Sequence, residues 1–206
     1  MSGLAVSLKL IAIVWISGLF IGTFIGWYAH RKLLAGYCLK LGWLLVSSVP
    51  VLVILFWLHF PLQKIIGIVV DPFITAASAL SVINIIFVSI IIKNALDDFP
   101  EQYAIAGRVT GLSEKEIFFS IKFPLIIRSV IPQLLFLQVA MLQATIFASL
   151  ISVEEIFRVA QRINSLIYKP VEIYTVLAML FLAVCLPLNY LAYWLKNKYT
   201  RNLSEK

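Results

Sequence analysis

The stretch FPEQYAIAGRVTGLSEKEIFFSIKFPLIIR, residues 99–128, forms a polar island in a chain that is otherwise almost continuously apolar. It predicts two short helices with a break at Gly111, because a helix commonly ends in a residue that can adopt a positive φ. Ser113 begins the second helix, and Glu116 follows three residues later to complete a capping box. Pro124 either ends this second helix or begins the next apolar segment.

The second helix of the polar island carries an apolar stripe. Ile117, Phe118 and Ile121 recur at helical spacing, with Lys115 and Lys122 beside them. Such a stripe needs a complementary apolar surface, and a groove on another protein provides one. The alternative is an amphipathic segment whose apolar face lies on lipid headgroups. The length of the island and its glycine break favour the protein groove.

The composition is that of an integral membrane protein. Of the 206 residues, 62% are apolar and 13% are charged, proportions that exclude an ordinary soluble domain. About twenty apolar residues cross a hydrocarbon core of roughly 30 Å. We therefore predict an all-α fold, in which residues 1–206 form a single transmembrane domain with five spans at about residues 10–28, 41–58, 73–92, 129–151 and 173–195. The first apolar run is long enough to remain as a span, so we expect the mature chain to begin at Met1.

The lysines and arginines indicate how the spans are oriented. An odd number of spans puts the two termini on opposite sides, and twelve of the 17 basic residues fall on one side: Arg31, Lys32, Lys40, Lys93, Arg108, Lys115, Lys122, Arg128, Lys196, Lys198, Arg201 and Lys206. The other side receives only Lys9, Lys64, Arg158, Arg162 and Lys169. Cytoplasmic loops carry the excess of basic residues, so we expect the polar island and the C-terminus in the cytoplasm and the N-terminus outside. The net charge of +7 then reflects topology, and no nucleic-acid partner is needed.

Several kinds of chemistry are excluded by missing motifs. The sequence has no GxxxxGK[ST] loop for nucleotide phosphates and no HExxH, CxxC or GxSxG pattern. Cys38 and Cys185 offer no disulfide framework, and His30 and His59 lie at the ends of different spans. We expect no catalytic residue, no metal site and no ATP hydrolysis in this chain.

Two local patterns bear on helix packing. Gly18, Gly22 and Gly26 recur every four residues in the first span, which predicts a ridge that another helix can approach closely. We expect this ridge to pack inside its own bundle rather than to form a dimer seam. In the second span, Pro50 follows two serines and predicts a kink.

The spans contain few polar residues, and these are the candidates for a translocation path. Asn84 is the main strongly polar residue of the third span, and its default use is a hydrogen bond to another helix, with path lining as the alternative. The candidate path-lining residues are Pro50, Asn84, Gln138, Gln143 and Thr145. Beyond the fourth span, residues 153–171 predict an outer helix in which Glu155 and Arg158 form a weak surface pair.

Two stretches resemble a known family. The spacing from Gly111 to Pro124 resembles the cytoplasmic EAA loop of ATP-binding-cassette (ABC) importer permeases. Residues 158–188 resemble the C-terminal signature of the polar amino acid uptake branch, with Pro170, Glu172, Tyr174 and Pro187 as its signature positions. The resemblance covers nearly the whole chain and implies a type I permease fold with a cytoplasmic coupling helix in a loop at about residues 99–122, here called the coupling loop.

The resemblance also implies partners and a location. Two permease subunits, alike or different, would form the path at their interface, and separate ATPase subunits would hold the ATP and Mg²⁺. An extracytoplasmic binding protein would deliver an amino acid or a similar small polar solute across a bacterial cytoplasmic membrane. The ATPase-docking residues implied are Ile105, Ala106, Gly107, Gly111, Leu112, Ser113, Glu116, Ile117, Phe118 and Pro124.

The chain departs from the family pattern at four places. In the second span it keeps only Pro50 of the family's Arg-Gly-Thr-Pro. Where the family has Glu-Ala-Ala, this chain has Ile105-Ala106-Gly107. Where the family has an acidic residue late in the third span, this chain has Ile90, and where it has Lys-Asp-Thr, this chain has Gln143-Ala144-Thr145. A neutral path is costly for a charged amino acid, so the substrate is less charged, a partner permease supplies the charges, or the pore only conducts what it receives. Two other hypotheses are a transport-inactive scaffold with the permease fold and an ion-coupled transporter.

Overall fold

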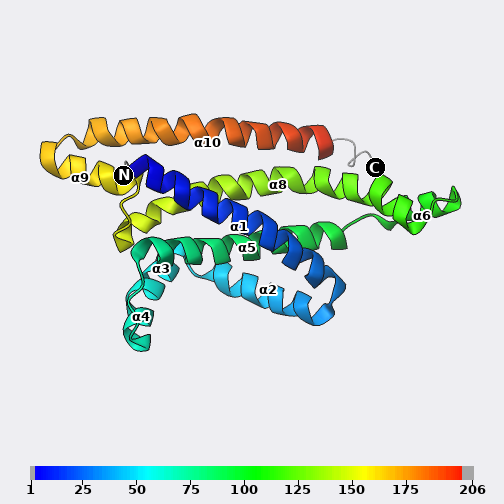
Figure 1. Ribbon diagram of the computed structural model, residues 1–206. Coiled ribbons are helices and arrows are strands. Elements are labelled where there is room, and N and C mark those ends of the chain that lie inside the picture. The colour runs from blue at the N-terminus through cyan, green and yellow to red at the C-terminus, as the bar shows by residue number, and fades with distance from the viewer. Residues whose placement is uncertain (1–2, 201–206) are drawn as a thin grey trace.

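Long helices that lie side by side make up the computed structural model, which describes residues 3–200 (Figure 1). No strand occurs in this part of the chain. Four helical segments are long and apolar enough to cross a membrane. They comprise α1 (Gly3–Arg31), α5 (Pro72–Asp97), α8 (Phe123–Ala144) continued by η2 (Thr145–Ile151), and α10 (Pro170–Thr200). These segments contain four of the five predicted spans.

The second predicted span is broken. It consists of α2 (Leu33–Ser48), followed by α3 (Val51–His59) and α4 (Pro61–Ile66), and the chain bends by 94° between Leu33–Ser48 and Val51–Ile66. The predicted interruption at Pro50 is present, but the prediction of one helix over residues 41–58 that merely kinks there is wrong. Pro50 has no N–H to continue the helix and forces Val49 into an extended conformation. The described chain has five spans only if this bent pair counts as one.

The polar island forms α6 (Glu101–Val109), α7 (Glu114–Ile117) and the π-helical turn η1 (Phe118–Lys122). Gly111 has a φ of 84°, which confirms the predicted break. Pro124 begins α8 without ending the preceding helix, because α7, η1, α8 and η2 run on as one helical segment from Glu114 to Ile151. The wider π turn, closed by the bond from the Phe123 N–H to the Phe118 carbonyl, precedes the proline that lacks a donor.

The glycine ridge of α1 packs against α5, as the sequence predicts. A Cβ atom added to Gly18 would lie 2.1 Å from the Asn84 Nδ2 atom, and one added to Gly22 would lie 2.7 Å from the Val88 Cβ atom. At Gly26 it would lie 2.5 Å from the Ser89 carbonyl oxygen. The two helices therefore touch through their backbones, inside this bundle.

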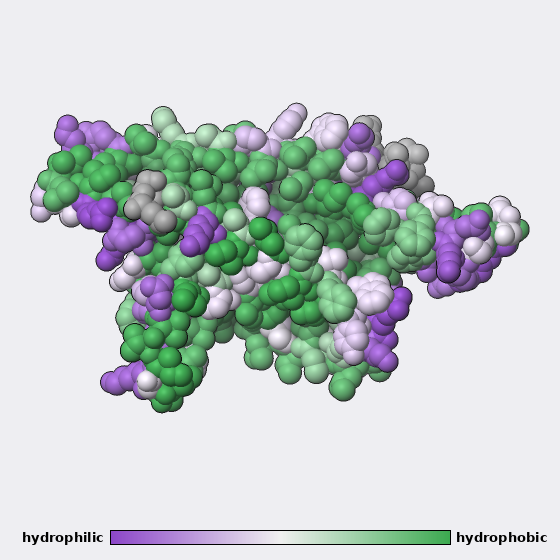
Figure 2. Space-filling view, in the orientation of Figure 1, coloured by the Kyte–Doolittle hydropathy of each residue, from purple (hydrophilic) through white to green (hydrophobic). Residues whose placement is uncertain are grey.

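The helices alternate in direction, so the two groups of basic residues fall at opposite ends of the molecule. Figure 2 shows hydrophilic residues near both ends and a largely hydrophobic surface between them. The coupling loop and the end of α10 share one end, and α4 and α9 (Ile156–Ile167) share the other. Met1, Arg201 and Lys206 lie outside the described residues. Which end faces the cytoplasm remains a prediction.

The outer segment differs from its prediction. Glu155 is fully buried, and its carboxylate caps α9 by accepting the Phe157 N–H at 2.9 Å and the Arg158 N–H at 2.8 Å. Burial raises the pKa of Glu155, although the two hydrogen bonds from the backbone act to lower it. The surface ion pair joins Arg162 to Glu154 at 3.0 Å, so the predicted pair with Arg158 is wrong. Side-chain spacing alone does not reveal that a carboxylate turns back onto the backbone of its own helix.

The close contact between α1 and α5 can be tested with one added methyl group. Gly22→Ala should lower the free energy of unfolding by about 1–3 kcal/mol, because the new Cβ overlaps Val88 and the Ile85 carbonyl oxygen. Gly42→Ala is the matched control, since nothing lies within 4 Å of its added Cβ and alanine favours a helix by about 0.5–1 kcal/mol over glycine. Melting of the purified variants in detergent measures both. Equal effects of the two substitutions would contradict the proposed packing.

Candidate functional site

The two arms of the coupling loop are packed together through a glycine. Gly107 of α6 is buried, and an added Cβ would lie 3.0 Å from the Ile117 Cγ1 atom and 3.1 Å from the Ile121 Cδ1 atom. Ile117 is itself fully buried. Two of the predicted docking residues, Gly107 and Ile117, therefore join the arms and do not face outward.

The turn between the arms is a Schellman motif. The Leu112 N–H donates to the Gly107 carbonyl oxygen, and the Gly111 N–H donates to the Arg108 carbonyl oxygen, both at 3.0 Å. The Thr110 hydroxyl donates to the Gly107 carbonyl oxygen at 2.9 Å. The last carbonyls of α6 are thus satisfied, and the positive φ of Gly111 sets the angle at which the chain leaves the helix.

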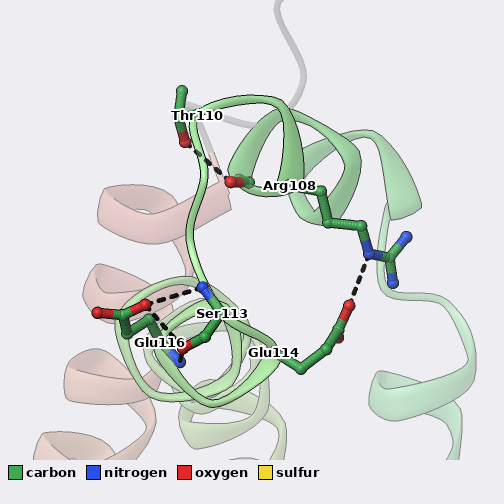
Figure 3. A network of polar contacts seen from close by, with 6 residues as sticks. Arg108, Thr110, Ser113, Glu114 and Glu116 are labelled. Carbon is green, nitrogen blue, oxygen red and sulfur yellow. Dashed lines mark hydrogen bonds and ion pairs between the residues drawn. The ribbon is translucent and has the colours of Figure 1, made fainter.

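Two further contacts brace the turn (Figure 3). The Ser113 N–H donates to Glu116 at 2.8 Å, and the Glu116 N–H donates back to the Ser113 hydroxyl at 3.4 Å, which confirms the capping box. Arg108 Nε donates to Glu114 Oε1 at 2.7 Å across the gap between the arms. Exposed ion pairs add little stability, but this one joins the two arms on the side opposite the capping box.

The outer face of α6 is apolar and exposed. Val109 is 82% exposed, Ile105 is 52% exposed, and Leu112 in the turn is 37% exposed. The predicted docking residues on the surface are Ile105, Ala106, Gly111, Leu112, Ser113 and Glu116, whereas Phe118 and Pro124 are half-buried. Val109 was missed by the sequence reasoning, although it follows Ile105 by four residues and so shares its face.

Three of the candidate path-lining residues are buried between helices. The Asn84 and Gln138 side chains bond to each other twice, from Asn84 Nδ2 to Gln138 Oε1 at 3.0 Å and from Gln138 Nε2 to Asn84 Oδ1 at 3.2 Å. Asn84 also donates to the Val14 carbonyl oxygen at 2.9 Å, so the group joins α1, α5 and α8. Thr145 is buried and donates to the Leu142 carbonyl oxygen. The structure thus confirms the expected default for Asn84, which is a hydrogen bond to another helix.

The other two candidates, Gln143 and Pro50, are exposed. Pro50 lies at the break after α2, whereas Gln143 belongs to an exposed stripe along α8 and the start of η2. The stripe consists of residues spaced by three or four: Gln133, Phe136, Ala140, Gln143 and Phe147. Hydrocarbon cannot satisfy an amide, so we expect this face to meet protein or water. Between α8 and α10 it borders a groove of about 800 Å³ that Gln143 and Cys185 help to line.

Comparison with known proteins identifies the family. Residues 18–201 match the family model described as binding-protein-dependent transport system inner membrane component. The chain belongs to this family. The resemblance to ABC importer permeases is thereby confirmed.

Curated relatives are amino acid permeases. The permease is 29% identical over 119 residues to the probable glutamine ABC transporter permease protein GlnP of Bacillus subtilis, a match that covers 58% of this chain and 54% of the relative. It is 25% identical over 148 residues to the arginine ABC transporter permease protein ArtQ of Haemophilus influenzae, covering 69% of this chain and 67% of the relative. The matched part thus spans between half and two thirds of these relatives.

Solved structures share the fold over almost the whole permease. A crystal structure of an amino acid ABC transporter with histidines superposes with a TM-score of 0.79 at 22% identity, covering 95% of this chain and 92% of the other. An inward-facing form of the MetNI methionine ABC transporter gives a TM-score of 0.65 at 16% identity, covering 97% and 94%. At these identities the likeness concerns the fold alone.

The C-terminal signature residues lie on α10 of the permease. Pro170 begins the helix, Glu172 is exposed in its first turn, and Pro187 lies inside it. The Tyr174 ring lies 6.0 Å from the Phe157 ring and so joins α10 to α9. Within residues 3–200, no group of three or more His, Cys, Asp or Glu side chains could hold a metal ion.

Substitution can separate a structural role of the buried amides from path lining. Asn84→Ala should lower the stability of the permease by about 0.6–1.7 kcal/mol, the range of hydrogen bonds between membrane helices. The double variant with Gln138→Ala should lose less than the sum of the single losses, because each residue needs the other. Gln143→Ala, which removes an exposed amide from the same helix, is the control and should leave melting nearly unchanged. Additive losses, or altered substrate affinity at unchanged stability, would contradict the structural role.

Proposed function

We propose that this permease is a subunit of an ATP-driven ABC importer and that its coupling loop docks a separate ATPase subunit. The observation that carries the proposal is the loop itself, which projects beyond the end of the helix bundle (Figure 1). Its outer face presents Ile105, Val109 and Leu112 to solvent, and its inner contacts hold the two arms at a fixed angle. A rigid projection with an apolar face suits a groove on a partner protein.

The helices on either side of the coupling loop can carry motion into the spans. Helical structure continues from Glu114 to Ile151, and only three residues separate α5 from α6. When ATP binding closes the ATPase dimer, its grooves carry the loops with them, and each loop moves the ends of α5 and α8. The spans rock from inward-open to outward-open, and hydrolysis resets them.

The proposed cargo is an amino acid or a similar small polar solute, delivered by an extracytoplasmic binding protein. Two permease subunits, alike or different, would enclose the path, and the stripe on α8 is the face that supplies amides to it. ATP and Mg²⁺ belong to the partner ATPase, and the assembly would lie in a bacterial cytoplasmic membrane. The names of the curated relatives support the substrate class.

The neutral residues Ile90, Gln143 and Ala144 favour a second candidate function. A subunit that kept the permease fold but lost substrate handling would serve as a scaffold or regulator of the transporter. Both candidates predict ATPase docking, so uptake separates them: the importer moves solute into proteoliposomes when ATP is hydrolysed, and the scaffold does not.

The rigidity of the loop can be tested at its turn. Gly111→Val forces a β-branched residue to a φ of 84°, while nothing within 4 Å of the added Cβ obstructs it. The strain of about 1–2 kcal/mol should change the angle between the arms. In proteoliposomes with the ATPase, uptake should fall by about tenfold, equivalent to ~1.4 kcal/mol, while ATP hydrolysis and membrane levels persist.

Gly67→Val is the matched control, because Gly67 has a φ of 74° and equally free space around its Cβ, but follows α4, a helix at the other end of the permease (Figure 1). It should carry the same strain and leave uptake per ATP unchanged. Normal uptake by Gly111→Val, or equal losses in both variants, would contradict the proposal.

A further inference from the structure

A cavity lies at the base of the coupling loop, between α5, α6 and α8. Its volume is about 400 Å³, within the range of about 300–1,000 Å³ typical of small-molecule sites. Polar side chains from all three helices and the α5–α6 connection line much of it: Asn94, Asp98, Gln102, Tyr103, Ser129 and Gln133. No Lys, Arg or His is among the lining residues, so the charge that they carry is negative, although the Lys122 ammonium lies beside Phe99, one of these residues.

Asp98 supplies that charge. Its carboxylate has no hydrogen-bond or ion-pair partner among residues 3–200, whereas its neighbour Asp97 pairs with both His30 and Lys93. A carboxylate can accept hydrogen bonds from several N–H groups, and the Asp98 oxygens are free to accept them from a ligand. Adjacent residues at the end of α5 thus have different contacts: Asp97 joins the ends of α1 and α5, and Asp98 borders the cavity.

The rest of the cavity wall suits a small polar solute that carries an ammonium group. The Tyr103 ring lies 6.3 Å from the Phe99 ring, and Lys122 lies over Phe99 with its Nζ 5.4 Å from the ring centroid. Lys122 therefore occupies one aromatic surface, and Tyr103 remains for a ligand cation. The Gln133 Nε2 atom donates to the Ser129 carbonyl oxygen, which leaves its Oε1 atom free to accept.

We infer that this cavity binds a small solute carrying an ammonium group, held by the Asp98 carboxylate and the Tyr103 ring, with the amides of Asn94, Gln102 and Gln133 taking its other polar groups. The site is separate from the groove beside Gln143, which α8 and α10 form. Its position on the cytoplasmic side rests on the proposed function, but the binding itself does not. Because the walls belong to the two spans joined by the coupling loop, an occupied site favours one spacing of α5 and α8 over others.

Calorimetric titration of the full chain in lipid nanodiscs tests the inference without an ATPase. The probes are L-lysine, L-glutamine and L-glutamate, which share an α-ammonium group and differ in net charge. Lysine should bind saturably and more tightly than glutamine, with glutamate weakest. Asp98→Asn should weaken lysine binding by about tenfold or more, the effect expected for a lost charge-assisted hydrogen bond.

Glu101→Gln is the matched control, because Glu101 is an exposed carboxylate three residues away that does not line the cavity. It should change lysine binding by less than about twofold, since screened surface charges contribute little. Gln133→Ala is a second variant that should weaken binding without removing a charge. Absence of saturable binding by all three probes, or equal losses in Asp98→Asn and Glu101→Gln, would overturn the inference. Failure here leaves ATPase docking untouched, and failure of docking leaves this binding intact.

Discussion

The reciprocal hydrogen bonds between the Asn84 and Gln138 side chains fix the arrangement of the spans. A membrane offers no water to these amides, so they satisfy each other, and the remaining Asn84 donor reaches the Val14 carbonyl oxygen. Gly18 makes this possible, because a Cβ there would overlap the Asn84 side chain. One polar group thereby ties α5 to both α1 and α8. Within residues 3–199, no other side-chain hydrogen bond joins α5 to α8, the helices that bear the coupling loop.

The coupling loop depends on that spacing, because its arms extend from α5 and α8. Three short-range contacts make the loop a rigid unit. They are the packing of Gly107 on Ile117, the Schellman turn at Gly111 and the ion pair of Arg108 with Glu114. In the proposed mechanism, a movement of the loop would therefore be passed to the spans and not absorbed within it. The cavity beside Asp98 lies at this same junction, where a bound solute would meet the moving parts.

Local patterns made much of the fold predictable from sequence. The positive φ of Gly111 and the capping box of Ser113 depend on neighbouring residues only, and four spans are set by apolar length. The 94° bend after α2 was not predictable, since a proline signals a break but tertiary packing sets its size. The burial of Glu155 was missed for a related reason, because charged side chains are usually exposed. In the candidate site, residue spacing predicted the two short helices and the turn at Gly111, but which of their residues face outward depends on how α6 packs.

The most direct test of the account is to find what touches the outer face of α6 in the membrane. A photo-activated cross-linking amino acid can replace Val109, which is 82% exposed on that face. As a control it can replace Val69, which is 97% exposed and lies three residues after α4, a helix at the opposite end of the molecule. After illumination of native membranes, mass spectrometry identifies the attached protein. The account predicts a cross-link from position 109 to an ABC ATPase subunit and none from position 69. An ATPase found at neither position, or equally at both, would contradict docking through the coupling loop.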